Sequence, residues 1–498
     1  MDTHSSHDGI KTPNARLLSW PISYRACGVV AVICLVGLVL RMYAGGFLSL
    51  SADEFGKVTL AWIGLNKPAM WFNAPWLPSH FPLLAGAYLL IGNLLIASRL
   101  VSILFGIVAI IAIYRLGCHL KEESVGGLAA ILAATSPLTV WLSATGLVDI
   151  LYVALFIFGL SYYVQWQRSG GLYALYVACT LFAVSCAFHY NAWLAGMAVG
   201  LLLGYDLVWG QNRNRLHVLL GLGILSIVPI AWCAGNWISE GDPLAFLYKH
   251  IHDSAPLYEN WGASPPSLKS AIYFLASKIL DHGPVLAALA LASAAGVVRP
   301  SEERQTLWRL WFVLLIFGLG LIFLFARGGL PTAYPDRYLL LPLIIMTVLF
   351  AHGLSVLIRN RDRYVRVFAW LLCSIALMTN LWLTLHYPIN HERIQEAAEV
   401  ADFLAQTDHV QAGKRVLLEV KSLNDVVIGV FLNDPSMIIG VPNQTPALLQ
   451  SEEAVRRFAK EKAIGCIGVW SEASRASMEK WGLPRIGQVR SYAFYQLN

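Results

Sequence analysis

The chain changes from apolar to polar at the stretch Ser51-Ala52-Asp53-Glu54-Phe55, which follows its first long apolar segment, residues 26–44. Two adjacent carboxylates at the end of a membrane-embedded segment are costly to desolvate, so such residues are candidates for chemistry. The stretch alone also fits an ordinary solvated loop that carries two acidic residues. The rest of the chain has to decide between these two interpretations.

Composition indicates the class of protein. Of the 498 residues, 57% are hydrophobic and only 13% are charged, whereas soluble proteins contain about 45–50% apolar and about 25% charged residues. We therefore expect a chain that crosses a membrane many times and contacts its lipids. The net charge of +6 comes from basic residues in short clusters between apolar runs. Such clusters are typical of topology signals, so no nucleic-acid partner is expected.

The cysteine and metal-ligand patterns indicate no additional chemistry. All cysteines except Cys466 fall in or beside apolar segments, and the sequence has neither a Cys-x-x-Cys pair nor metal-ligand spacing. We interpret the cysteines as structural thiols and expect no metal site. An Asp-x-Asp triplet is also absent from the sequence, which disfavours a nucleotide-sugar donor held by a divalent ion.

About eleven stretches approach the length of about 20 apolar residues that a membrane span needs. They are residues 26–44, 100–117, 126–144, 149–165, 172–189, 191–208, 218–235, 271–297, 310–326, 338–357 and 367–385. The first stretch resembles a signal peptide, with Ala44-Gly45-Gly46 as a cleavage site. The long polar region before it and the interruption by Arg41 favour an uncleaved anchor with a cytoplasmic N-terminus.

The apolar run 81–96 decides the topology. If it does not cross the membrane, the basic clusters at 11–25, 299–309 and 359–366 all face the cytoplasm. If it crosses, the later clusters move to the outside, which the positive-inside rule disfavours. We therefore predict that residues 67–96, with their aromatic and proline residues, lie at the outer interface. This topology also gathers the polar residues between the spans on the outer side.

From Pro388 onward the composition is that of a soluble protein. Predicted helices at 394–404, 452–462 and 471–481 alternate with predicted strands at 415–420, 437–441, 464–470 and 489–496, which is typical of a small α/β domain. We divide the chain into a cytoplasmic tail (1–25), an all-α membrane domain (26–387) and an outer α/β domain (388–498). The last domain carries no catalytic motif. We expect it to be structural or to guide the acceptor, and its removal to leave the Asp53 site intact.

Six motifs follow one another in a recognisable order. They are Asp53-Glu54, His80-Phe81-Pro82-Leu83, Arg99-Leu100-Val101-Ser102, Ala134-Thr135-Ser136-Pro137 with Asp149, Asn236 with Gly241-Asp242-Pro243, and Asp336-Arg337-Tyr338. This order resembles that of the polyprenyl-phosphate-dependent glycosyltransferases of the GT-C fold, which include protein O-mannosyltransferases and lipid A aminoarabinose transferases. Two departures are the missing first proline after His80 and the turn His189-Tyr190-Asn191, where many relatives have a Lys-Gly pair.

The resemblance implies a GT-C-like bundle that transfers a sugar, with inversion, from an undecaprenyl-type phosphate to an acceptor hydroxyl or phosphate. It also implies Asp53 as the base, because the family uses the first acid of this pair. We expect Glu54 to orient the site or to bind the sugar, and Asp149 to face it as a second carboxylate. The alternative for Asp149 is a helix cap.

The departing lipid phosphate needs cationic ligands, and the forked donors of arginine suit it well. Arg337 is the best candidate, followed by Arg99 and Lys249, while snorkelling at the interface is the alternative for all of them. We expect His80 and Tyr190 to contact the acceptor or the sugar. The resemblance implies no required cofactor, although some relatives bind a divalent cation.

The acceptor stays open between a lipid, a glycan and a protein, and so does the sugar. Other functions that fit the sequence are a glycan polymerase or ligase with a polyprenyl-diphosphate donor and, on weaker grounds, a transporter, which would carry ionisable residues near the membrane midplane. A non-catalytic scaffold predicts that Asp53→Ala has no effect on activity. We expect a multi-pass protein of the bacterial inner membrane whose active site faces the periplasm.

Overall fold

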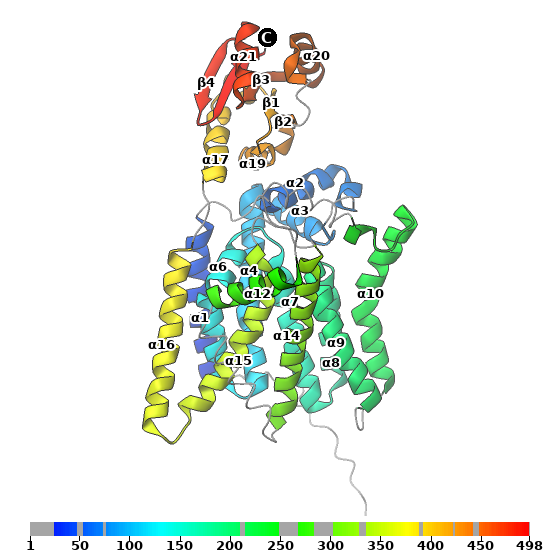
Figure 1. Cartoon of the computed structure of the whole chain (residues 1–498), viewed down its shortest axis with the longest axis vertical. Helices are drawn as coiled ribbons and strands as arrows, with labels where there is room; N and C mark the ends of the chain where they lie inside the picture. Colours follow the sequence, from blue (N-terminus) through cyan, green and yellow to red (C-terminus); the bar gives the residue numbers. More distant parts are fainter. Residues whose placement is uncertain are drawn as a thin grey trace, which may run out of the picture.

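The computed structural model describes residues 24–46, 53–72, 76–209, 215–248, 267–282, 302–327, 335–387, 392–421, 424–441 and 448–497. A bundle of long helices forms the lower part of the molecule in Figure 1, and a small α/β domain lies above it. Helices α2 (Asp53–Asn66) and α3 (His80–Ile91) lie between these two parts. The predicted fold class, a polytopic helical bundle with a C-terminal α/β domain, is confirmed.

The bundle consists of twelve described helices. They are α1 (Tyr24–Gly45), α4 (Leu94–Leu120), α5 (Glu123–Thr135), α6 (Pro137–Ala144), α7 (Asp149–Ser169), α8 (Leu172–Cys186), α9 (Tyr190–Trp209), α10 (Arg215–Glu240), α12 (Leu268–His282), α14 (Glu302–Ala326), α15 (Leu340–Ile358) and α16 (Arg363–Leu385). In the described part of the chain, 8 helices are long and apolar enough to cross a membrane, or 9 if the bent pair α5–α6 forms one span. The protein is therefore a multi-pass membrane protein.

Two of the predicted spans differ from the structure: residues 126–144 fall in the bent pair α5–α6 and not in one helix, and residues 172–189 form a shorter helix. This shorter helix, α8, has 15 residues. Of the span predicted at 271–297, the structure describes α12 as far as His282, and the remainder lies outside the described residues. The apolar run 81–96 does not form a span, as predicted, because it is divided into α3 and the beginning of α4.

Local sequence explains the division between α3 and α4. Gly92 has a φ of 77°, a left-handed conformation that glycine adopts without strain, and it ends α3 after 12 residues. Asn93 then caps α4, and its side-chain oxygen accepts a hydrogen bond from the N–H of Ile96. A 12-residue helix is too short to cross a bilayer, which needs about 20 residues.

The break between α5 and α6 leaves backbone carbonyls without helical partners, and side chains from distant helices satisfy them. Pro137 begins α6 and lacks an N–H, and the two helices meet at an angle of 60°. Thr384 of α16 donates to the carbonyl of Thr135 at 2.9 Å, and Asn380 of α16 donates to that of Leu132 at 3.1 Å. Such side-chain partners allow a helix to break inside a membrane.

The α/β domain contains a sheet of five strands with the order β2-β1-β3-β5-β4. The strands are β1 (Arg415–Glu419), β2 (Ile438–Val441), β3 (Ile464–Val469), β4 (Arg485–Val489) and β5 (Tyr492–Gln496). The helical segments of this domain are α17 (Glu392–Ala405), α18 (Asp408–Gln411), α19 (Asn424–Phe431), α20 (Glu452–Lys462) and α21 (Glu472–Lys480), and its short 3-10 turns are η4 (Pro435–Met437) and η5 (Leu448–Gln450). Two further 3-10 turns lie in the membrane domain, η2 (Pro68–Phe72) after α2 and η3 (Pro335–Leu339) before α15. Strand β1 is parallel to β2 and β3, whereas β5 is antiparallel to β3 and β4. The predicted strands and helices are present, and the sequence prediction missed β4 and α19.

Candidate active site

An ion pair joins the beginning of α2 to the 3-10 turn η3. Arg337 donates from Nη1 to Oδ2 of Asp53 at 2.7 Å, and their side chains are 7% and 29% exposed. Asp53 is thus more accessible than its partner. Because a guanidinium has five N–H donors, this contact leaves Arg337 further donors for another anion.

Glu54 points to the other side of α2 and is fully buried. Its Oε1 accepts hydrogen bonds from Nε of Arg99 at 3.2 Å and from the N–H of Gly146 at 2.8 Å. Arg99 also donates to the carbonyl of Gly45 at 2.7 Å. A Cβ at position 146 would lie 2.6 Å from Oγ of Ser98, so this close approach requires glycine. Glu54 and Arg99 therefore tie α2 to α1, α4 and the loop after α6.

Lys57 lies one helical turn after Asp53 and on the same face of α2. Its side chain is buried, and Nζ lies 5.5 Å from the ring centroid of Trp76. Burial, assisted by the positive charge of Arg337, lowers the pKa of the Lys57 ammonium to about 8, against the opposing effect of Asp149 and Asp53. Lys57 is charged at pH 7 and loses its proton in the mildly alkaline range.

Asp149 begins α7 and is fully buried. Neither of its carboxylate oxygens has a hydrogen-bond partner among the described residues. A capping aspartate accepts a hydrogen bond from a backbone N–H in the first turn of the helix, and Asp149 makes no such bond to the described chain. Nε2 of His189 lies 3.8 Å from Oδ1 of Asp149. The N–H of Asn191 donates to Nδ1 of His189 at 3.0 Å, which places the proton of a neutral imidazole on Nε2, facing Asp149.

A cavity of about 90 Å³ lies beside these groups. It is lined by polar and aromatic side chains, among them Lys57, Trp76, His80, His189, Tyr190, Phe246, Arg337 and Tyr338. His80 is buried, and neither ring nitrogen has a hydrogen-bond partner in the described structure. Burial, together with the charge of Lys57, holds the pKa of His80 well below its ordinary value, so the ring is neutral at pH 7.

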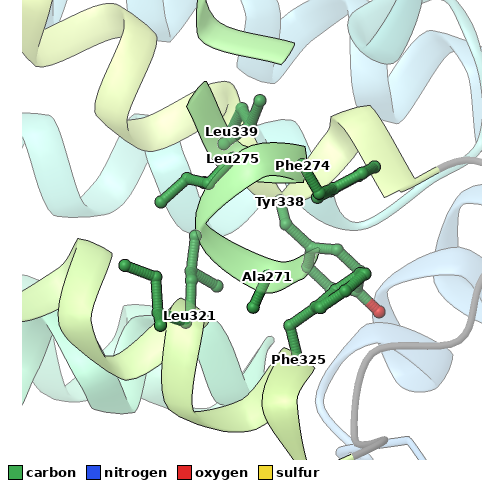
Figure 2. Close-up of a pocket in the computed structure, with 8 residues that line it drawn as sticks. Ala271, Phe274, Leu275, Leu321, Phe325, Tyr338 and Leu339 are labelled. Carbon is green, nitrogen blue, oxygen red and sulfur yellow. The ribbon is translucent and has the colours of Figure 1, made fainter. Parts of the chain in front are cut away.

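An apolar groove of about 480 Å³ lies between α12, α14 and α15. Its walls include the exposed side chains of Leu280, Leu315 and Leu319. Figure 2 shows a smaller apolar pocket, whose residues Leu275, Leu321 and Leu339 also line the groove. Tyr338 belongs both to this small pocket and to the polar cavity. The groove, the small pocket and the polar cavity are therefore neighbours, with Tyr338 between the last two.

The structure thus brings together most of the predicted site residues. His80, Tyr190 and Arg337 line the cavity, Asp53 is paired with Arg337, and Asp149 is buried near His189. The described cavity lining does not include Glu54 or Arg99, and Lys249 lies outside the described residues.

Sequence reasoning assigned no role to Lys57 or His189, although both were among the polar residues of the predicted outer side. The i, i+4 spacing of Asp53 and Lys57 was an available signal for Lys57. In the described ranges, three or more His, Cys, Asp or Glu side chains do not cluster in a way that could hold a metal ion.

We predict that Glu54→Ala destabilises the protein. The change leaves the partly buried Arg99 guanidinium without its carboxylate and the N–H of Gly146 without its acceptor, which should lower the free energy of unfolding by about 3 kcal/mol. Denaturant unfolding in detergent measures this change. Glu453→Ala, at an exposed position of α20, is the control and should shift stability by less than about 0.5 kcal/mol. Equal stability of the two variants would contradict the structural role of Glu54.

Comparisons with known proteins agree with the motifs. Residues 74–232 match the family model for dolichyl-phosphate-mannose-protein mannosyltransferases. The fold is similar to that of ArnT from Cupriavidus metallidurans in a crystal structure with undecaprenyl phosphate, at 12% identity and a TM-score of 0.65, over 95% of this chain and 98% of the other. No curated protein sequence matches the chain.

The fold is also similar to that of the oligosaccharyltransferase from Archaeoglobus fulgidus. The apo crystal structure has 11% identity and a TM-score of 0.57, over 93% of this chain and 72% of the other. The same organism's AglB, in complex with an inhibitory peptide and a dolichol-phosphate, has 14% identity and a TM-score of 0.55, with the same shares. The family match over residues 74–232 and the shared fold agree with the predicted resemblance to the polyprenyl-phosphate-dependent GT-C glycosyltransferases.

Proposed function

We propose that the protein transfers a sugar from a polyprenyl-phosphate donor to a lipid, glycan or protein acceptor, with inversion at the anomeric carbon. The observation that carries this proposal is the cavity lined by the cations Arg337 and Lys57, with the carboxylate Asp53 paired to Arg337 and an apolar groove nearby. A lipid monophosphate sugar has two corresponding parts: an anionic, hydroxyl-rich head that suits the cavity and an apolar tail that suits the groove. ArnT with undecaprenyl phosphate and AglB with a dolichol-phosphate support the choice of donor.

The donor phosphate would lie against Arg337 and Lys57. Arg337 offers Nε, which has no hydrogen-bond partner among the described residues, in addition to the donors of its planar fork. Lys57 adds a second positive charge whose burial strengthens its attraction to an anion. These two cations can balance the charge of the departing phosphate, so the proposed mechanism requires no metal ion.

In the proposed reaction Asp53 takes the proton of the acceptor hydroxyl. The hydroxyl oxygen forms a bond to the anomeric carbon while the bond from that carbon to the phosphate oxygen breaks, and the phosphate leaves with the bonding electron pair. A single displacement of this kind inverts the anomeric centre. The ion pair with Arg337 keeps Asp53 ionised before the reaction, as a base must be.

The donor tail would lie in the apolar groove between α12, α14 and α15. The groove has exposed leucine side chains in its walls and shares Leu275, Leu321 and Leu339 with the small apolar pocket, and Tyr338 of that pocket also lines the cavity. A polyprenyl chain could therefore enter sideways from the membrane while its phosphate reaches Arg337.

We also propose that the site faces the outside of a bacterial inner membrane. Figure 1 shows α2, α3 and the α/β domain at one end of the bundle. The basic segment 359–366, between α15 and α16, lies at the opposite end. Positive charge marks the cytoplasmic side, which supports an outward-facing site.

We predict that Asp53→Asn abolishes transfer without unfolding the protein. Loss of the base should reduce turnover by about 10²–10⁴-fold. The measurement is transfer by purified protein from radiolabelled polyprenyl-phosphate sugars to a membrane extract. Asp402→Asn, at an exposed position of α17, is the control. Transfer by Asp53→Asn at the wild-type rate would assign the base to Asp149 instead. If the wild type transferred no sugar from any polyprenyl monophosphate, a polymerase or ligase with a diphosphate-linked donor would be favoured.

The pH dependence of transfer tests Lys57. Because its pKa in the folded protein is about 8, the ammonium loses its proton as the pH rises through 8, and kcat/KM should then fall by about tenfold per pH unit. Lys57→Gln should lower kcat/KM below pH 8 and remove this alkaline decline. An unchanged decline in Lys57→Gln would assign the titration to another group.

Filling the apolar groove tests the path of the donor tail. A Cβ added at Gly318 meets no atom of the described residues within 4 Å, so Gly318→Phe should place its ring in the groove without disturbing the bundle. We expect a raised KM for donors with long polyprenyl chains and an unchanged KM for donors of two isoprene units. Gly223→Phe, on the exposed side of α10, is the control. The same KM increase for both donor lengths would contradict this path.

A further inference from the structure

Helix α2 presents its residues to two different partners. Asp53 and Lys57 face Arg337 and the cavity, whereas Phe55, Val58 and Ala61 are buried in a hydrophobic core. Isolated helices of about 12–15 residues are only marginally stable in water, and α2 has 14 residues. Its position therefore depends on what packs against its apolar side.

That apolar side packs against the α/β domain. The core that contains Phe55 and Phe81 also contains Ala397 and Leu404 of α17, Val416 of β1 and Ile428 of α19, and all of these are buried. The rings of Phe55 and Phe431 lie 5.6 Å apart, centroid to centroid, with their planes tilted by 42°. One hydrophobic core is thus shared by α2, α3 and the domain that follows the last membrane helix.

A polar contact fixes the same domain to the turn between α3 and α4. Asn433 follows α19, and its side-chain oxygen accepts a hydrogen bond from the N–H of Leu94 at 2.8 Å. Its side-chain nitrogen donates to the carbonyl of Gly92, also at 2.8 Å. Asn433 has a φ of 57°, a left-handed conformation that asparagine tolerates better than most residues. Both backbone groups lie at helix ends, where partners are otherwise lacking.

We propose that the α/β domain positions α2 for catalysis, through Phe431 against Phe55 and through Asn433 on the α3–α4 turn. The link to turnover rests on the function proposed above. The domain contacts α2 on the side opposite to the cavity, and the turn that it holds precedes Arg99, the partner of Glu54. Movement of the domain would thereby change the placement of Asp53 and Lys57.

This proposal revises the expectation that removal of residues 388–498 leaves the Asp53 site intact. Removal would expose Phe55, Val58 and Phe81, which are at most 1% exposed in the whole chain. Phe431 and Asn433 are positioning residues in this view, since they act through α2 and touch neither the cavity nor its charged groups.

The test compares two large-to-small variants of the domain. Phe431→Ala removes the ring that packs on α2. Met478→Ala is the matched control, because Met478 is buried in the core on the other face of the sheet, with Leu417 and Ile467, and that core includes no residue of α2 or α3. Hydrogen–deuterium exchange of the amides of residues 53–66, together with kcat, is measured in the full chain.

In Phe431→Ala we expect the α2 amides to exchange faster and kcat to fall by about 10²-fold, as for a misplacement of about 1 Å. Phe431→Leu should restore both. In Met478→Ala both should match the wild type. Asn433→Gly keeps the left-handed backbone but loses both hydrogen bonds, and it should speed exchange of the Leu94 amide.

Two results would overturn the proposal. One is wild-type exchange of the α2 amides in Phe431→Ala. The other is equal acceleration in Met478→Ala, which would indicate general loosening of the domain. Exchange is measured without substrate, so a wild-type protein that transfers no sugar would refute the proposed function and leave this test of positioning unaffected.

Discussion

The ion pair between Arg337 and Asp53 is the contact on which the arrangement of the site depends. It joins two residues that are 284 positions apart in the sequence, and the Arg337 side chain is only 7% exposed. Breaking a buried ion pair by removing one partner is costly, because the other charge is left uncompensated. The beginning of α2 is therefore held at η3, and Lys57, one turn later, is held beside the cavity.

The membrane imposes a second constraint, because backbone carbonyls that are freed at the break between α5 and α6 need hydrogen-bond partners there. The break is tolerated because Thr384 and Asn380 of α16 supply hydrogen-bond donors to carbonyls at the end of α5. The N–H of Gly146 can then reach Oε1 of Glu54. The loop that follows the broken helix pair thus helps to anchor α2.

Most of the spans, the failure of residues 81–96 to cross the membrane and most of the α/β domain could be predicted, because hydropathy, the placement of basic clusters and alternating strands and helices can be read from the sequence. Strand β4 was missed because Arg485-Ile486-Gly487-Gln488-Val489 is short and contains glycine. Asp53 was selected as a site candidate from the family resemblance and Arg337 from the chemistry of its guanidinium, whereas their contact depends on tertiary structure that no local pattern encodes. The grouping of Arg99 with the phosphate ligands failed to anticipate its hydrogen bond to Glu54 for the same reason.

The polar atoms around the cavity argue for a ligand with many hydrogen-bonding groups. Both ring nitrogens of His80, both carboxylate oxygens of Asp149 and Nε of Arg337 are buried and lack hydrogen-bond partners among the described residues. Each such atom lowers stability by about 1–3 kcal/mol, and a folded protein normally contains few of them. A bound molecule that supplies donors and acceptors would satisfy these particular atoms. A sugar phosphate offers both, since its hydroxyls can donate to Asp149 and its phosphate can accept from Arg337. An apolar ligand would leave all of these atoms unsatisfied, so the same side chains that weaken the free protein favour a polar substrate over an apolar one.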